Sequence, residues 1–127
     1  MGSVDGIYIS KDHTLTITDS VDKLATFSGS FISNNLLTGG VHYDQISGQY
    51  RFAADAQAWP AQISFFAILA PIPPASRKHV IADYWNGIRT ADGSIIMSGV
   101  RTYTTDEGIY DIYTFEKVIF TLTPTEA

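Results

Sequence analysis

The stretch that decides the fold is HVIADYWNGIRTADGSIIMSGVRTYTT, residues 79–105. Val, Ile, Thr and Tyr are frequent on both sides of Asp92-Gly93, and such residues favour strands. The Asp-Gly dipeptide is typical of the tight turn between two antiparallel strands. The stretch therefore predicts a β-hairpin with strands over residues 79–90 and 94–105.

The same alternation of strand-forming runs and turn residues continues towards both ends of the chain. Nine runs are predicted to be strands, at residues 6–10, 14–19, 24–33, 36–44, 49–55, 61–70, 79–90, 94–105 and 112–123. Asn34-Asn35 and Ser47-Gly48 are typical of two further hairpin turns. Consecutive strands joined by short loops indicate an antiparallel meander. Closing the meander into an up-and-down barrel removes its exposed edges, and a sandwich is the alternative.

Composition indicates one soluble domain over residues 1–127, with 45% hydrophobic and 17% charged residues. The net charge is −5 and the eight Lys and Arg residues are scattered, so we expect no nucleic-acid partner. The most apolar stretch, residues 63–74, is too short and too rich in proline to span a bilayer, so we expect no membrane partner. The compartment stays open, because a secreted or periplasmic protein whose signal peptide has been removed would look the same.

The alternation of side chains predicts which face of each strand points inward. For residues 24–33 we expect the face with Phe27, Phe31 and Ser33 to line the barrel. For residues 94–105 we expect Ile96, Ser98, Val100 and Thr102 to point inward, and Ile95, Met97, Arg101 and Tyr103 to point outward. An apolar outer face is what a subunit interface requires, which predicts a homo-oligomer, either a dimer or a tetramer.

Five short segments carry a resemblance to a known family. They are GIYISKDHT (6–14), FSGSF (27–31), LLTGG (36–40), YWNGIR (84–89) and VIFTLT (118–123). In this order they resemble segments of the avidin and streptavidin-like proteins. The resemblance implies an eight-stranded antiparallel up-and-down β-barrel, usually a homotetramer, that holds biotin in the barrel mouth.

Position by position, the resemblance implies a ligand site whose residues come from both halves of the chain. These are Ser10, Thr14, Phe31, Ser33, Phe66, Asp83 and Trp85. Ser10 and Thr14 are expected to donate to a ureido oxygen, and Ser33 to bond a ureido nitrogen. Trp85 and Phe66, or its neighbour Phe65, are expected to form the apolar wall. Phe31 stands where a Tyr hydroxyl is expected, and Asp83 where a hydroxyl near the ligand sulfur is expected.

Two departures from the family pattern weaken the expected binding of biotin. Val100 stands in place of a third tryptophan, and Val118 stands in place of a carboxylate. Losing a buried hydrogen bond or an aromatic contact costs about 1–3 kcal/mol each. We therefore expect a non-catalytic binding protein that takes biotin weakly, or a different small, partly apolar ligand, and no cofactor.

The alternative function is a small β-barrel isomerase or cyclase that holds an apolar substrate in the lumen. Asp83 or Glu116 would then polarise or deprotonate that substrate, since both could face the lumen. A barrel whose lumen is simply filled by side chains is a third interpretation. We expect no metal site, because His13, His42 and His79 are far apart in the sequence. The basic segment 76–79 is expected in a solvated loop, with a clamp for a ligand carboxylate as the alternative, and Trp59-Pro60 is expected to plug the barrel or anchor an interface.

Overall fold

The chain folds into a closed barrel of eight antiparallel strands. The computed structural model describes residues 4–34, 40–54, 58–69, 79–105 and 107–124. The strands are β1 (Gly6–Ile9), β2 (His13–Ile17), β3 (Thr26–Ser33), β4 (Val41–Ala54), β5 (Ala58–Leu69), β6 (His79–Arg89), β7 (Ser94–Thr105) and β8 (Tyr110–Leu122). Each strand pairs with the next, and β8 returns to β1. The predicted eight-stranded up-and-down barrel is confirmed, and the alternative of a sandwich is not. Among these residues the chain forms no helix of the length and apolarity that crossing a bilayer requires.

The hairpin predicted at Asp92-Gly93 joins β6 to β7. Its turn is closed by a backbone hydrogen bond from the Thr90 amide to the Ser94 carbonyl, 2.8 Å long. The Asp92 carboxylate accepts a further bond from the Ser94 amide at 3.1 Å. Gly93 has a φ of 96°, which side-chain-bearing residues rarely adopt. The turn therefore sets the register of β6 and β7, which pair from His79–Thr105 to Arg89–Ile95.

The turn predicted at Ser47-Gly48 is wrong. The two runs expected at residues 36–44 and 49–55 contribute to one strand, β4, whose described part starts at Val41. Gly48 lies inside that strand, opposite Phe27 on β3 and Phe65 on β5. A Cβ atom at Gly48 would lie 2.2 Å from the Phe27 ring, so this glycine makes room for the ring and does not turn the chain. Residues 36–39, and Asn35 of the other predicted turn, lie outside the described residues.

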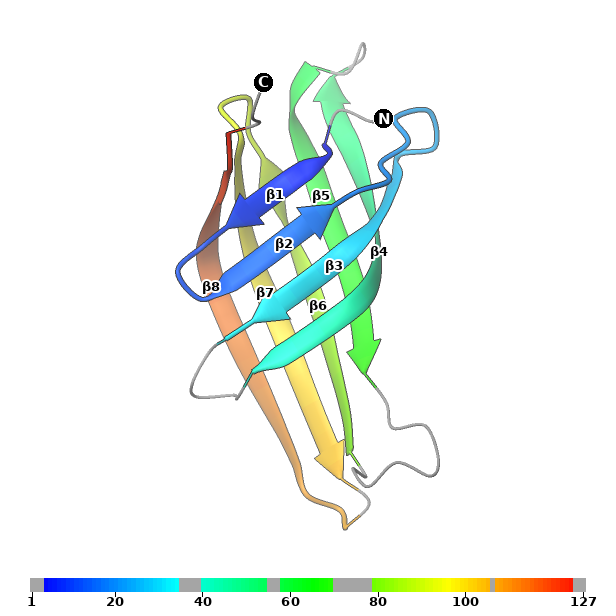
Figure 1. The fold of residues 1–127 in the computed structure, drawn as a ribbon, viewed down its shortest axis with the longest axis vertical. Coiled ribbons are helices and arrows are strands. Elements are labelled where there is room, and N and C mark those ends of the chain that lie inside the picture. Colours follow the sequence, from blue (N-terminus) through cyan, green and yellow to red (C-terminus); the bar gives the residue numbers. More distant parts are fainter. Residues whose placement is uncertain (1–3, 35–39, 55–57, 70–78, 106, 125–127) are drawn as a thin grey trace.

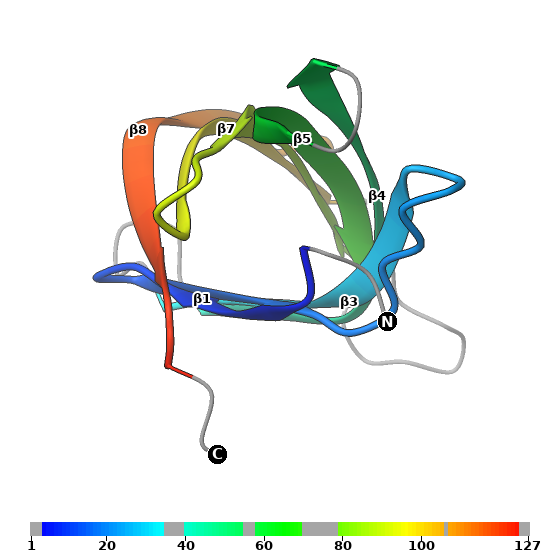
Figure 2. The same cartoon turned by 90° about the horizontal axis from the view of Figure 1, so that it is seen from above.

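The two halves of the barrel differ in length and direction. β5–β8 run along the long axis of the molecule, and the shorter β1–β3 cross in front of them (Figure 1). Seen from above, the eight strands form a ring (Figure 2). Both described ends of the chain lie near the end that carries the β6–β7 hairpin (Figure 1).

The barrel wall parts at two places towards the opposite end. β4 and β5 pair only from Ser47–Phe66 onwards, so residues 41–46 and 67–69 are not paired with each other. β8 pairs with β1 only through Leu122 and Thr121, which leaves residues 110–120 paired with β7 alone. We call these places the β4–β5 seam and the β1–β8 seam.

Aromatic rings fill the middle of the barrel. Trp85 is fully buried, with its ring centroid 5.1 Å from that of Phe115 and 5.3 Å from that of Phe31. Phe65 and Phe120 complete the group and are also buried. Most of the lumen is therefore a packed core, and any ligand site must lie beside these rings.

The inward face predicted for residues 24–33 is confirmed, whereas the one predicted for 94–105 is wrong. Phe27, Phe31 and Ser33 are buried. On β7, however, Ile95, Met97 and Arg101 are buried, and their neighbours Ile96 and Val100 are 39% and 43% exposed. Directly paired residues on neighbouring strands point to the same face. Trp85 pairs with Gly99 and Asp83 with Arg101, so burial of the first of each pair brings the second inside.

Candidate functional site

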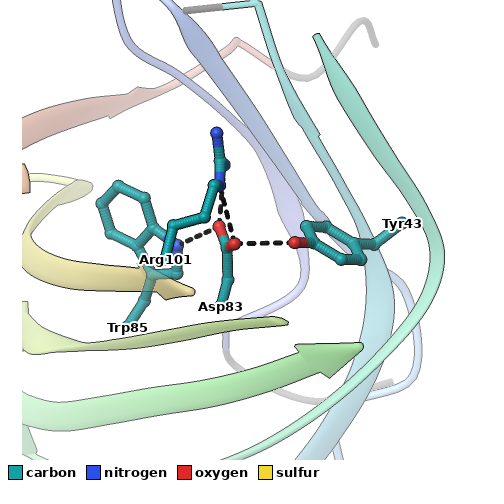
Figure 3. A network of polar contacts seen from close by, with 4 residues as sticks. All are labelled: Tyr43, Asp83, Trp85 and Arg101. Atoms are coloured by element: carbon teal, nitrogen blue, oxygen red, sulfur yellow. Dashed lines mark hydrogen bonds and ion pairs between the residues drawn. The ribbon is translucent and has the colours of Figure 1, made fainter. Parts of the chain in front are cut away.

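A buried carboxylate, Asp83 on β6, is the centre of a polar network in the half of the barrel with the seams (Figure 3). Arg101 on β7 donates to both of its oxygens, from Nε to Oδ1 and from Nη2 to Oδ2, each at 2.8 Å. The Tyr43 hydroxyl donates to Oδ1 at 2.6 Å, and the Trp85 indole N–H donates to Oδ2 at 2.9 Å. Each carboxylate oxygen thus accepts two hydrogen bonds, and the Arg101 charge neutralises the Asp83 charge.

The network joins strands that the backbone leaves apart. Tyr43 lies on the part of β4 that has no partner on β5, and its hydroxyl reaches Asp83 on β6 across the β4–β5 seam. Ala67, the β5 residue paired with Asp83, is buried and small, which leaves space for this contact. Burial raises the pKa of the Tyr43 phenol, and the hydrogen bond to the Asp83 carboxylate raises it further. Tyr43 therefore stays a neutral donor.

Among the residues that the structure describes, two buried polar groups beside this network have no hydrogen-bond partner. They are Nδ1 of His13 and Oγ of Ser33. His13 on β2 and Ser33 on β3 are paired directly in register, so both side chains enter the barrel next to each other. A buried donor or acceptor without a partner costs about 1–3 kcal/mol. Two such groups side by side mark a place where the protein is not satisfied by its own contacts.

The His13 ring is held in a cage of other rings. Its centroid lies 5.2 Å from that of Trp85, 5.3 Å from that of Phe115 and 5.7 Å from that of Phe31. Burial lowers the pKa of His13 from its ordinary value of 6.5, and the positive charge of Arg101 lowers it further, while Asp12 and Asp83 act in the opposite direction. The imidazole is therefore neutral at neutral pH. A neutral imidazole offers one donor and one acceptor.

A depression of about 400 Å³ opens next to His13 at the β1–β8 seam. Its apolar lining consists of Phe115 and Val118 beside the His13 ring, with Ile119, 60% exposed, at the outer edge. Its rim carries Ser10, Lys11, Asp12 and Glu116. An apolar floor with a polar rim, next to unsatisfied buried groups, is the usual composition of a small-molecule site.

A larger depression, of about 720 Å³, lies over the β4–β5 seam. Its lining includes Asp19, Asp44, Phe66 and Ile68, all of which are exposed. Of the two residues with unpartnered buried groups, His13 lines the smaller depression, and neither lines this larger one. The chemistry of the described residues therefore favours the smaller depression beside His13.

Four of the seven predicted site residues lie inside the barrel. Ser33, Asp83, Trp85 and Phe31 are all fully buried and surround the ring cage and the polar network. Asp83 does not face a ligand with free oxygens, because four hydrogen bonds occupy it. Ser33 is the member of this set whose polar atom remains available.

Two of the other three predicted site residues, Thr14 and Phe66, lie on the outer face and not inside the barrel as expected. Thr14 lies on the outer face of β2, where the buried residues are His13, Leu15 and Ile17. Phe66 is 51% exposed on the outer face of β5, and the neighbour named as its alternative, Phe65, is the buried one. A shift of one residue moves a strand side chain to the opposite face.

Ser10 lies in the turn between β1 and β2, at the rim of the depression. Its hydroxyl donates to the His13 carbonyl at 3.3 Å and accepts from the His13 amide at 3.0 Å. These two bonds position the start of β2, and with it the His13 ring. Ser10 therefore supports the site from its edge.

The residues weighed for catalysis and metal binding are scattered. Glu116 is exposed on β8, so it does not form a buried pair with Asp83. Val100, expected in place of a tryptophan, points outward. Among the described residues, no three His, Asp or Glu side chains are placed to hold a metal ion. Residues 76–78 and the His79 side chain lie outside the described part.

Trp59 packs at the other end of the barrel, with the Arg89 guanidinium 4.1 Å above its ring.

Sequence reasoning missed three residues of the site, namely His13, Tyr43 and Arg101. The signal for Arg101 was the register of the hairpin, since Asp83 lies nine positions before Asp92 and Arg101 nine positions after it, and the turn pairs the two. Counting outward from the turn would have placed both charges on one face. Tyr43 gave no such signal, because it meets Asp83 across a seam where the strands are not paired.

Comparisons with known proteins add no family to this description. No protein-family model matches the chain, and neither the curated proteins nor the solved structures searched give a match. The likeness to avidin and streptavidin-like proteins therefore rests on the five sequence segments alone.

Proposed function

We propose that this protein binds one small, uncharged, partly apolar ligand at the end of the barrel beside His13 and Ser33. The observation that carries the proposal is the pair of neighbouring buried groups, His13 Nδ1 and Ser33 Oγ, that have no hydrogen-bond partner. Retaining them costs stability, and a ligand that bonds both would recover that cost.

The surroundings of this pair select the chemistry of the ligand. The charges of Asp83 and Arg101 neutralise each other, and His13 is neutral, so the buried site favours no ionised group. A donor and an acceptor on one planar edge, as in an amide, a lactam or a cyclic urea, would match the hydroxyl and the imidazole. The rest of the ligand would lie against Phe115, Val118 and Ile119 in the depression.

Preorganisation is the source of affinity in this proposal. The backbone ladder of β2 and β3 fixes both polar groups, and the ring cage holds the imidazole from several sides. Binding then requires little ordering of the protein, and the rings exclude water from the new bonds. The cyclic urea and apolar chain of biotin match this description, whereas its carboxylate is ionised at neutral pH and would have to remain at the polar rim. We expect it to bind weakly, because Asp83 is already occupied and Val118 offers no carboxylate.

Calorimetric titration with biotin and with imidazolidin-2-one tests the proposal. We expect saturable binding of at least one probe and a shift of the His13 side-chain nitrogen signals in NMR. Ser33→Ala should remove most of the affinity. Ser30→Ala is the matched control, because Ser30 lies on the outer face of the same strand. If neither probe gives binding heat or shifts the His13 nitrogen signals, binding at this site is refuted. Equal affinity of the two variants would refute it as well.

No observation favours the alternative of an isomerase or cyclase. Asp83 is saturated by four donors and paired with Arg101, which leaves no lone pair to act as a base. Glu116 is exposed at the rim. We therefore propose binding without catalysis.

A further inference from the structure

The inner face of β8 is covered less completely than that of its neighbour β7. Phe115 and Val118 pack against the core from β8, yet both side chains are only half-buried. On β7 the inward residues Met97 and Arg101 are almost completely buried. The barrel is therefore incompletely closed along β8.

The lack of a neighbouring strand explains this exposure. β8 pairs with β1 only at Thr121 and Leu122, and it continues far beyond the end of β1 (Figure 1). No described strand lies along the remaining edge of residues 110–120. The peptide N–H and C=O groups of such an edge are available to a further strand.

The free edge leads to the depression beside His13. Over residues 110–115 the pairing of β8 with β7 is regular, as the addition of another strand requires. The irregularity between Phe115 and Val118 ends this regular stretch, and both of these residues line the depression. A strand added along 110–115 would therefore end at the depression.

The β4–β5 seam has a similar open edge but lacks these half-buried inward residues. Val41, Tyr43 and Ile46, on the part of β4 that has no partner on β5, are all buried. His13, with its unpartnered nitrogen, lines the depression at the β1–β8 seam and not the one at this seam. Within the described part of the chain, the three features coincide at the β1–β8 seam.

We infer that the group bound beside His13 and Ser33 is carried by an extended polypeptide, which adds a strand to the free edge of β8 and inserts an asparagine or glutamine side chain into the depression. This inference rests on the function proposed above and names the class of ligand. A side-chain amide has N–H donors and a carbonyl acceptor, which match the unpartnered imidazole nitrogen and hydroxyl. Adding a strand to an exposed sheet edge is a common way of binding extended peptides.

The shape of the depression favours a polypeptide over a free small molecule. Sites for small molecules enclose most of their ligand. This depression, of about 400 Å³, has exposed residues at its outer edge, Lys11, Glu116 and Ile119, and would leave one side of a small ligand in water. A polypeptide supplies the missing cover, because its neighbouring inward side chains would lie over Phe115 and Val118.

Titration with the capped peptide acetyl-Lys-Val-Thr-Asn-Thr-Val-Lys-amide tests the inference. Its Val and Asn side chains share one face when the peptide is extended. The native protein should bind it about tenfold or more tightly than acetamide, which has the same amide without the backbone. Replacing the Asn of the peptide by Leu should remove most of the affinity. Ser33→Ala should weaken binding of the Asn peptide, and Ser30→Ala on the outer face of the same strand is the matched control.

Hydrogen exchange of the native protein shows where the peptide backbone lies. Binding should slow the exchange of amides in residues 110–115, because the added strand covers that edge. Residues 41–46, the open edge of the other seam, are the internal control and should exchange as before.

The outcomes separate this inference from the proposed function. Binding of imidazolidin-2-one but not of the Asn peptide would overturn the inference and leave the proposed function intact, whereas binding of neither would overturn both. Equal affinity of the Asn and Leu peptides would overturn the inference as well. Slower exchange at 41–46 in place of 110–115 would also overturn it.

Discussion

Asp83 shows how a single buried residue organises one end of the barrel. Its carboxylate draws donors from β4, β6 and β7, and none of its lone pairs is left for solvent (Figure 3). A buried ion pair adds little net stability compared with a well-packed apolar core, because both charges lose their hydration. Removing one partner is different, since the other charge then remains buried alone.

Asp83→Asn should therefore lower the free energy of unfolding by about 3–5 kcal/mol, because Arg101 keeps its charge inside the barrel. Urea denaturation followed by circular dichroism measures this. Asp44→Asn is the matched control, because Asp44 forms an exposed pair with His42 and its substitution should change stability little. Equal effects of the two substitutions would show that the network does not stabilise the fold.

His13 couples the site to pH. Its folded-state pKa lies below the ordinary 6.5, so the unfolded chain takes up the proton first as the pH falls. The stability contributed by the neutral ring is complete above 6.5 and decreases as the pH falls from there towards the folded-state pKa.

Between about pH 7.5 and about pH 5.5, the range around an ordinary histidine pKa, the native chain should lose more stability than His13→Phe does. Phenylalanine fits the ring cage and cannot take up a proton. The melting temperature at both pH values measures the difference, and the same substitution at exposed His42 is the control. A pH dependence in His13→Phe as steep as in the native chain would contradict the assignment.

The site residues could be predicted from the sequence only where the register was right. Ser33, Asp83, Trp85 and Phe31 were placed inside correctly, because each lies in a run whose two faces differ in character. Two errors, Thr14 for His13 and Phe66 for Phe65, are displacements of one residue. In a strand such a displacement exchanges inside for outside, and adjacent residues of similar polarity give no signal to prevent it.

At the scale of the strands, close contact between glycine and an aromatic ring sets the packing of β6 on β7. Gly99 pairs with Trp85, and a Cβ atom at this position would lie 2.4 Å from the indole ring. The absence of a side chain at Gly99 lets the Trp85 indole lie flat over β7. Gly48 on β4 makes room in the same way for the ring of Phe27 on β3.

Gly99→Ala should lower the free energy of unfolding by about 1–3 kcal/mol, because the methyl group forces the Trp85 ring from its position. Tryptophan fluorescence should report the displacement, and thermal unfolding the loss of stability. Gly40→Ala is the control, since its nearest neighbouring atom would lie 3.8 Å from the new methyl group. An unchanged emission spectrum in Gly99→Ala would refute this account of the contact.

The strands that could be predicted are those that end at a residue pair typical of a turn and of nothing else. Asp92-Gly93 predicted the β6–β7 hairpin correctly, whereas the turn predicted at Ser47-Gly48 is wrong, because these residues lie inside β4. A glycine needed for close packing and a glycine needed for a turn are identical in the sequence. The prediction of the inward face of β7 was wrong for a related reason. Ile95 and Ile96 are the same residue type, and only the pairing with β6 determines which of them points inward.

At the scale of the whole molecule, the barrel is closed unequally around its circumference. β6 and β7 are paired along their whole common length, whereas β1 and β8 share only the pairs Tyr8–Leu122 and Ile9–Thr121. The closure of the ring was predictable from the need to remove exposed edges. The seams were not, because the extent of pairing depends on strand tilt, which no local pattern reports.

Native-state hydrogen exchange should show this difference directly. Amides of β1 should exchange well before those of β6 and β7, because local opening at the β1–β8 seam breaks few bonds. Mass spectrometry of peptides from the two regions measures the order. Simultaneous exchange of β1 and β6 would indicate that the barrel opens only as a unit.

The two seams also have a consequence for how this protein survives storage. Residues 41–46 and 110–120 each have one backbone edge that no described strand covers. A peptide edge of this kind is a template on which foreign extended chains can grow into fibres. In concentrated solution we therefore expect the shelf life of this protein to be limited by fibre growth from these edges well below its melting temperature.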